Sequence, residues 1–175
     1  MSNPYIPYPS KILDVIKHTQ KEYTFRMEFT GDVKPGQFFE VSVPKFGEAP
    51  ISVSGIGENY VDLTIRRVGR VTNEVFESYV GQTLLLRGPY GNGFDIDLYR
   101  DGETVVVAGG TGVSPVRGVI HALSNMDNSK DKYAITGFRS PDDMLFRDDL
   151  KAWEEKLNLI LTVDGAPEGY KGNVG

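Results

Sequence analysis

The sequence contains no cysteine, which excludes disulfide bonds, thiolate metal ligands and a cysteine nucleophile within this chain. Its only histidines, His18 and His121, are too few and too far apart in the sequence to indicate a metal site. No stretch approaches the roughly 20 apolar residues that a membrane-spanning helix needs. The first residues lack the basic start and apolar centre of a secretion signal. We therefore expect a cytoplasmic protein without a resident metal.

An excess of positive charge is also lacking. The 175 residues carry 19 basic and 24 acidic side chains, a formal net charge of −5, which argues against nucleic acid as a partner. A hydrophobic content of 39% with 25% charged residues is typical of a soluble globular protein. The length allows one large domain or two small ones.

The first half of the chain, to about residue 88, alternates apolar and polar residues with period two. Apolar and aromatic residues occupy every second position from Tyr23 to Phe29, with Thr24 and Arg26 between them. The same alternation recurs in the runs 39–43, 61–65 and 84–86. Short alternating runs separated by glycine and proline turns predict a small antiparallel β-barrel. One helix interrupts it, with Thr72 as the expected N-cap.

The second half has a different pattern. A continuous apolar run, 104–108, precedes a helical spacing that begins at Val113, and the strand-like segments KYAITGF (132–138) and NLILTV (158–163) flank a helix predicted over 147–156. Strand–helix–strand–helix–strand predicts a parallel sheet wrapped by helices. We expect two domains, a barrel over 1–97 and an α/β domain over 98–175, with their boundary near 95–103. Since a doubly wound sheet would continue after the third strand, we expect the second domain to be truncated at its C-terminal end.

The segment VVVAGGTGVSPV (105–116) joins a buried strand to a helix through a glycine cluster. Backbone N–H groups of such a loop, together with the helix N-terminus, favour a bound phosphate. The usual third glycine of the G-x-G-x-x-G pattern is replaced by Pro115. If Ser114 is the N-cap, the proline falls at the first helical position, where its missing N–H costs nothing. An ordinary strand-to-helix turn is the alternative.

GGTGVSP resembles the pyridine-nucleotide loop of the ferredoxin–NADP reductase superfamily. Further motifs agree with this family in the same order along the chain: PIS (50–52), RRVGRVT (66–72), GPYGNGF (88–94), GFRS (137–140) and DGAPEGYKG (164–172). Within the superfamily, the resemblance is first to the electron-transfer (flavin) component of anaerobic sulfite reductase. The flavin subunit of dihydroorotate dehydrogenase and the gamma subunit of sulfhydrogenases follow.

The resemblance implies a flavin site in the barrel. It places Ser52 near the flavin N5, as the residue closest to the chemistry, and makes FAD the expected cofactor. The flavin would be held by Pro50, Ile51, Ser52, Ile65, Arg66, Arg67, Gly69, Val71, Thr72, Gly88, Tyr90 and Gly91, with Tyr90 or Phe94 able to stack on a ring. Two solvated serines on a strand and a solvated Arg-Arg pair are the alternatives for residues 50–67. The family often has arginine where this chain has Ala49, so Arg66 or Arg70 would supply more of the charge facing the flavin phosphates.

The resemblance likewise implies a nicotinamide-nucleotide site in the second half. It would be formed by Gly109, Gly110, Thr111, Gly112, Pro115, Phe138, Arg139, Ser140 and Asp164. An aspartate after the third strand would repel a 2′-phosphate and accept a hydrogen bond from a free 2′-hydroxyl, which favours NADH over NADPH. Arg139 and Ser140 weaken this preference, because they could hold a phosphate from the neighbouring turn.

Hydride transfer from nicotinamide to flavin needs no side-chain acid or base, which suits a chain without a catalytic dyad. We expect the flavin to pass electrons singly to a partner, namely the iron–sulfur and catalytic subunits of a multi-subunit reductase. In the resembled family an iron–sulfur cluster is bound by a cysteine-containing segment that this chain lacks. Two alternatives stay open: a subunit of dihydroorotate dehydrogenase or sulfhydrogenase, and a flavin- or partner-binding module that never oxidises nicotinamide.

Overall fold

The structure, a computed structural model, describes residues 5–79 and 82–164. The chain divides into two compact units, Met1–Gly93 and Phe94–Gly175, and each is described by itself. The division falls a few residues before the boundary expected from the sequence at 97/98.

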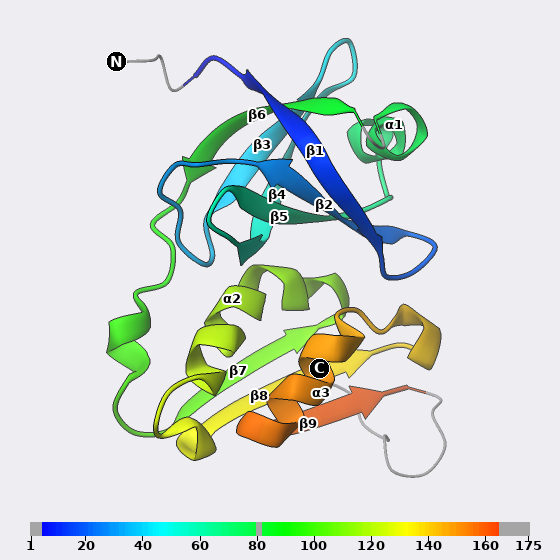
Figure 1. Ribbon diagram of the computed structural model, residues 1–175. Coiled ribbons are helices and arrows are strands. Elements are labelled where there is room, and N and C mark those ends of the chain that lie inside the picture. The colour runs from blue at the N-terminus through cyan, green and yellow to red at the C-terminus, as the bar shows by residue number, and fades with distance from the viewer. Residues whose placement is uncertain (1–4, 80–81, 165–175) are drawn as a thin grey trace. The chain divides into compact units, whose positions relative to one another are not determined.

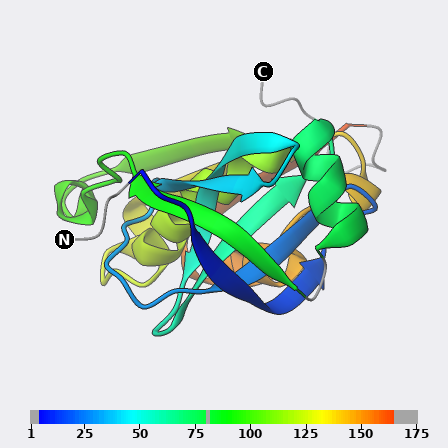
Figure 2. The same cartoon turned by 90° about the horizontal axis from the view of Figure 1, so that it is seen from above.

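The first unit is a six-stranded antiparallel barrel with one helix (Figure 1). Its elements are β1 (Tyr8–Lys17), β2 (Glu22–Glu28), β3 (Phe38–Val43), β4 (Gly47–Ile56), β5 (Tyr60–Arg66), α1 (Arg70–Ser78) and β6 (Thr83–Tyr90). The strand order is β1-β2-β5-β4-β3-β6, and β6 pairs with β1 to close the barrel, the two strands lying side by side in Figure 2. The predicted barrel with one helix is confirmed.

The alternating side chains fill the barrel as the period-two pattern predicts. Phe25, Phe39, Leu63 and Ile65 have no exposed surface, and together they belong to one continuous core. Burying a side chain of this size stabilises the fold by about 1.5–3 kcal/mol. Phe76 of α1 contacts the rings of both Tyr23 and Phe25 of β2, with centroid separations of 4.5 and 5.7 Å, which attaches the helix to the barrel.

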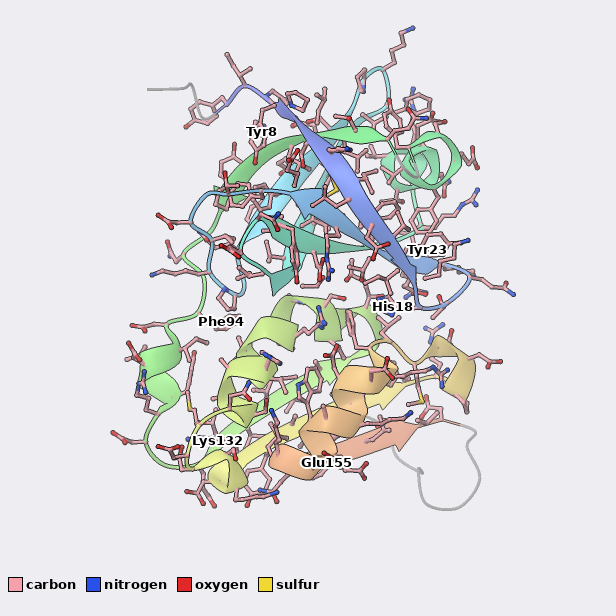
Figure 3. All side chains as sticks on the ribbon, viewed as in Figure 1. Tyr8, His18, Tyr23, Phe94, Lys132 and Glu155 are labelled. Atoms are coloured by element: carbon pink, nitrogen blue, oxygen red, sulfur yellow. The ribbon has the colours of Figure 1, made fainter. Side chains whose placement is uncertain are left out.

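The outward face of β2, β5 and β4 is unusual because it is polar and buried. Thr24 and Thr64 are 1% and 5% exposed, and Ser54 is fully buried. Their hydroxyl groups form a chain across the three strands, Thr24–Thr64 and Thr64–Ser54, each with an oxygen separation of 2.7 Å. His18, in the turn after β1, extends the chain through its Nε2, 2.7 Å from Thr24 (Figure 3). The sequence pattern alone predicts solvated positions here.

The second unit is a parallel sheet in the order β7-β8-β9 (Figure 1). Its elements are the 3₁₀ helix η1 (Ile96–Tyr99), β7 (Thr104–Gly109), η2 (Gly110–Gly112), α2 (Val113–Ser124), η3 (Ser129–Asp131), β8 (Lys132–Phe138), η4 (Pro141–Asp143), α3 (Arg147–Lys156) and β9 (Asn158–Val163). The predicted strands 132–138 and 158–163 and the predicted helix 147–156 are confirmed at both ends.

Both long helices of the described second unit cover the same face of its sheet. Ile120 of α2 and Trp153 of α3 pack with Ala134 of β8 in one core. On the opposite face Val105, Val107 and Ile160 keep 57%, 55% and 49% of their surface exposed. The sheet is therefore covered on one side, whereas the sequence pattern predicted a sheet wrapped by helices.

Candidate functional site

The predicted flavin-contacting serine belongs to a row of residues that crosses three strands of the barrel. Ser52 of β4 pairs with Phe38 of β3, and Phe38 pairs with Tyr90 of β6. Directly paired residues share a face of the sheet, so these three side chains lie on the same side. The rings of Phe38 and Tyr90 contact one another, with centroids 5.7 Å apart. A serine hydroxyl beside two aromatic rings can receive a flat polar ligand.

Phe38 was not predicted as a site residue. The sequence does contain a sign of this role. Phe38 shares a face of the strand FFEVSV (38–43) with Glu40 and Ser42, where a large aromatic side chain is unusual. Ile51, in contrast, is half-buried and packs against the barrel core. Ile65 is fully buried there, so only its backbone could face a ligand. Pro50, on the same face as Ser52, is exposed.

Arg87, which was not predicted as a site residue, lies near Ala49 through its contact with Glu48. Arg87 of β6 forms an ion pair with Glu48, with Nη2 2.6 Å from Oε2, and its Nη1 donates to the Tyr90 hydroxyl at 3.1 Å. Ser42 donates to the other oxygen of Glu48 at 2.5 Å. The hydrogen bonds from Arg87 and then from Ser42 lower the pKa of Glu48. Arg87 therefore lies beside Glu48 and Tyr90, and it directly precedes the segment GPYGNGF (88–94).

The segment RRVGRVT leads into α1, but Thr72 is not its N-cap. The helix begins at Arg70, and Gly69 is the N-cap residue, with an extended backbone (φ −150°, ψ 179°). Thr72 occupies the third helical position, and its Oγ1 accepts hydrogen bonds from the N–H groups of Val68 and Gly69 at 3.1 and 2.9 Å. The prediction was wrong by three residues because the threonine satisfies the helix start from inside the first turn.

The three arginines of this segment have different partners. Arg66 pairs with Glu22 at 3.2 Å, Arg67 pairs with Glu77, and Arg70 donates to the Lys45 carbonyl at 3.1 Å. A Cβ atom added to Gly69 would meet nothing within 4 Å, so the space before the first turn is open. Val71 turns its side chain towards the barrel core. Open backbone N–H groups flanked by cations suit a diphosphate.

The loop GPYGNGF depends on its glycines. Gly88 has φ +137°, and a Cβ there would lie 3.1 Å from both the Phe38 carbonyl oxygen and the Phe39 ring. Gly91 and Gly93 also have positive φ, at +85° and +68°. The loop therefore passes close over β3 and orients Tyr90 against Phe38. Phe94 is 37% exposed, and no ring contact of it is seen among the described residues.

In the second unit, β7 ends at Gly109 and the chain passes through η2 into α2. Gly110 has φ +53°, and added Cβ atoms at Gly110 and Gly112 would meet nothing within 4 Å. The loop is thus open at Gly110 and Gly112, in front of a helix N-terminus, which is the arrangement a phosphate prefers.

Ser114 is not the N-cap of α2. Gly112 holds that position, so Ser114 and Pro115 are the second and third helical residues. The prediction was wrong because η2 brings the chain into helical geometry early. The proline remains acceptable, since N–H groups of a first helical turn have no partner within the helix. The Ser114 hydroxyl is buried and finds no hydrogen-bond partner in the described part of the chain.

The carboxyl ends of β8 and β9 bring the remaining predicted residues together. The N–H of Asp164 donates to the carbonyl of Phe138 at 2.9 Å, which fixes Asp164 beside the turn that starts with Arg139. Phe138 itself is buried in the core, and Arg139 is exposed. Ser140 donates its hydroxyl to Asp143 Oδ2 at 2.7 Å. The remainder of DGAPEGYKG, residues 165–172, lies outside the described residues.

Solved structures share this architecture over nearly the whole chain. The ferredoxin reductase of carbazole 1,9a-dioxygenase superposes with a TM-score of 0.81 at 21% identity, covering 96% of this chain and 54% of that one. The NADH-dependent reduced ferredoxin-NADP oxidoreductase superposes with a TM-score of 0.79 at 24% identity, covering 98% and 61%. Residues 106–174 match the family model of the oxidoreductase NAD-binding domain. The chain thus has the ferredoxin–NADP reductase-like fold.

The curated relatives are named as subunits of larger enzymes. The gamma subunit of sulfhydrogenase 2 from Pyrococcus furiosus is 37% identical over 167 residues, 89% of this chain. A probable electron transfer subunit of dihydroorotate dehydrogenase B (NAD(+)) from Thermoplasma volcanium is 32% identical over 162 residues, 93% of this chain. The chain spans 58% of the length of each. The sequence motifs placed anaerobic sulfite reductase first. These relatives instead support the alternative, a subunit of dihydroorotate dehydrogenase or sulfhydrogenase.

Among the described residues, no helix has both the length and the apolar character to cross a membrane.

Proposed function

We propose that the chain is the flavin- and NAD-binding part of an electron-transfer subunit that oxidises NADH and passes the electrons to a partner redox subunit. The observation that carries the proposal is the combination of a glycine loop with open space before α2 and an NAD-binding family match over the same segment. FAD would be held by the arginine-flanked N-terminus of α1 and by the Ser52 row. When bound, a flavin accepts a hydride from nicotinamide and releases electrons one at a time.

The residues of the chain bind and orient in this proposal. The N–H groups of the first turn of α1, which follows Gly69, and the nearby arginines would hold a diphosphate, while Phe38 and Tyr90 would give a flat ring a surface beside the Ser52 hydroxyl. The backbone of Gly109–Gly112 holds the nucleotide phosphates. The hydride transfer itself needs no proton donor from the protein.

For the partner, we favour a hydrogenase-type assembly, with a dihydroorotate dehydrogenase as the second candidate. The basis is the identity of 37% and 34% to two sulfhydrogenase gamma subunits and of 32% to the dihydroorotate dehydrogenase subunit. Sulfite reductase as the partner, an iron–sulfur cluster and cytoplasmic residence rest on the sequence analysis alone. With no cysteine in the chain, such a cluster would need ligands from outside these 175 residues.

The test is reconstitution of the purified chain with FAD, followed by anaerobic addition of NADH. We expect a yellow protein whose visible flavin absorbance is bleached by NADH. A yellow protein that NADH does not bleach would favour the binding module without nicotinamide oxidation, and a chain that takes up no FAD would refute both readings.

The Ser52→Ala variant sharpens this test. We expect it to keep the bound flavin and to slow bleaching by about tenfold, because the hydroxyl beside the ring is lost. Ser78→Ala is the matched control, since Ser78 lies exposed at the end of α1 and donates to Glu74. Equal bleaching rates in the two variants would remove Ser52 from the proposed role.

A further inference from the structure

The turn after β8 contains a hydrogen bond that bears on which nucleotide this chain accepts. Ser140 precedes the short helix η4, and its hydroxyl donates to Asp143 Oδ2 at 2.7 Å. The backbone repeats the connection, because the Asp143 N–H donates to the Ser140 carbonyl at 3.1 Å. Side chain and main chain together hold the serine and the carboxylate in one tight turn.

Arg139 and Ser140 are the residues that could hold a 2′-phosphate. To do so, the serine would have to donate its single hydroxyl proton to a phosphate oxygen. In this turn that proton already goes to Asp143, so the phosphate would have to displace a carboxylate. Arg139 is exposed and has no hydrogen bond or ion pair to the described residues, so it offers a charge but no fixed geometry.

Charges of both signs surround this serine: Arg139 precedes it, and Arg147 donates to the carbonyl of Pro141, the next residue. Asp142 and Asp143 are both exposed on η4, and the backbone of Asp164 is tied to the carbonyl of Phe138, directly before Arg139. A phosphate oxygen within hydrogen-bond distance of Ser140 would lie close to the Asp143 carboxylate. Like charges at that separation repel, whereas a neutral 2′-hydroxyl meets no such penalty and can donate to a carboxylate.

We infer that Asp143 is a specificity-determining residue that makes this site reject a 2′-phosphate and accept dinucleotides with a free 2′-hydroxyl. This inference rests on the proposed function. Asp143 acts in two ways, by occupying the Ser140 hydroxyl and by placing a charge beside it. Asp164 contributes from β9, but the partner that engages Ser140 is Asp143.

The experiment measures binding of NAD⁺ and NADP⁺ to the full chain by calorimetry, because these two ligands differ only in the 2′-phosphate. We expect the unaltered chain to bind NAD⁺ more tightly. Asp143→Ala should raise the affinity for NADP⁺ by about tenfold and leave that for NAD⁺ within about twofold. Asp143→Asn should give a smaller gain, since the amide removes the charge but its oxygen still accepts from Ser140.

Asp142→Ala is the matched control. It removes the same charge from the neighbouring position of η4, where the structure shows no bond to Ser140, and should change NADP⁺ affinity by less than about twofold. Adding Ser140→Ala to Asp143→Ala should cancel most of the gain, because the released hydroxyl is what the phosphate uses. Fluorescence of Trp153, the single tryptophan, checks that each variant is folded.

Three results would overturn the inference. If Asp143→Ala and Asp142→Ala raise NADP⁺ affinity equally, only the net charge matters. If Asp143→Ala weakens both ligands equally, the aspartate merely supports the turn. If the unaltered, folded chain binds neither ligand, the proposed function itself fails, a result distinct from the first two because no selectivity exists to alter.

Discussion

The two units of this chain differ in whether their sheet is closed and in how much apolar surface it exposes. The barrel closes on itself, and even the buried polar groups on its outward face are hydrogen-bonded to one another across β2, β5 and β4. The α/β unit is an open sheet with one apolar face exposed at Val105, Val107 and Ile160. It also buries the hydroxyls of Ser114 and Thr136 without partners in the described part of the chain. Among the described residues, the barrel leaves one buried side-chain group without a partner, the Tyr8 hydroxyl, whereas the α/β unit leaves three, since the Trp153 Nε1–H also lacks one.

This difference teaches where rigidity and adaptability lie. A closed sheet has no free edge and is rigid, whereas glycine-rich loops at the ends of an open sheet are more adaptable. Four substitutions would sharpen or break the comparison.

The largest effect is expected from Phe25→Ala in the barrel core. Phe25 is fully buried and contacts both Tyr23 and Phe76. Removing the ring should lower the free energy of unfolding by about 3–5 kcal/mol, measured by urea denaturation with circular dichroism. Val68→Ala is the control, because Val68 is 70% exposed. A loss below about 1 kcal/mol would contradict a tightly packed barrel.

In the second unit, we expect Lys132→Met to cost about 3 kcal/mol. Lys132, labelled in Figure 3, is fully buried, and its Nζ donates to the carbonyls of Tyr99, Arg100 and Gly102 at 2.8, 3.1 and 2.7 Å. Methionine fills the volume but leaves three carbonyls unpaired. Trp153 fluorescence during urea denaturation measures the loss. Lys130→Met should be nearly neutral, because within the described residues the Lys130 Nζ donates to the carbonyl of the exposed Glu155 alone.

A smaller effect is expected from Thr64→Val, which interrupts the hydroxyl chain while preserving shape. Thr64 stands between Thr24 and Ser54, so both lose a partner, at a cost of about 2 kcal/mol. Thr83→Val on the exposed end of β6 is the matched control. Equal unfolding midpoints for these two variants would show that the outward polar face does not contribute to the stability of the barrel.

The smallest effect concerns Tyr8 and appears only at alkaline pH. Its hydroxyl is buried without a partner in the described residues, and this burial raises the pKa of Tyr8 to about 12 from 10.0. Because the folded-state pKa is the higher one, the stabilisation is complete below pH 10 and is lost as the pH rises towards 12. Tyr8→Phe should remove this loss and stay within about 1 kcal/mol of the parent at pH 7. Unfolding midpoints between pH 7 and 11 measure it, with Tyr99→Phe as the control.

The sequence predicts regular elements well where local pattern decides them. NLILTV and the helix over 147–156 have the right bounds because apolar spacing and flanking residues agree there. The caps at Thr72 and Ser114 were placed wrongly, because Gly69 and Gly112 serve as N-caps without any side chain that could mark them.

Features that depend on distant partners were not predictable. Lys132 begins a strand and looks like a solvated residue, yet its three acceptors come from about 30 positions earlier in the chain. Arg87 and Phe38 belong to the candidate site only because β3 pairs with β4 and β6, which brings them close to Glu48 and Ser52. Ser140 was recognised as a phosphate-binding candidate, but its engagement with Asp143 appears only once the turn is formed.

The hydrogen bond that Ser54 donates to the main chain sets the direction of the hydroxyl chain across the barrel. Ser54 donates its single proton to the Asp62 carbonyl, so it must accept from Thr64, which in turn must accept from Thr24. With its own proton spent on Thr64, Thr24 can only receive one, and the imidazole of His18 has to supply it from Nε2. A main-chain carbonyl on β5 thereby requires a proton on Nε2 of a ring four hydrogen bonds away, in the turn that leads out of β1.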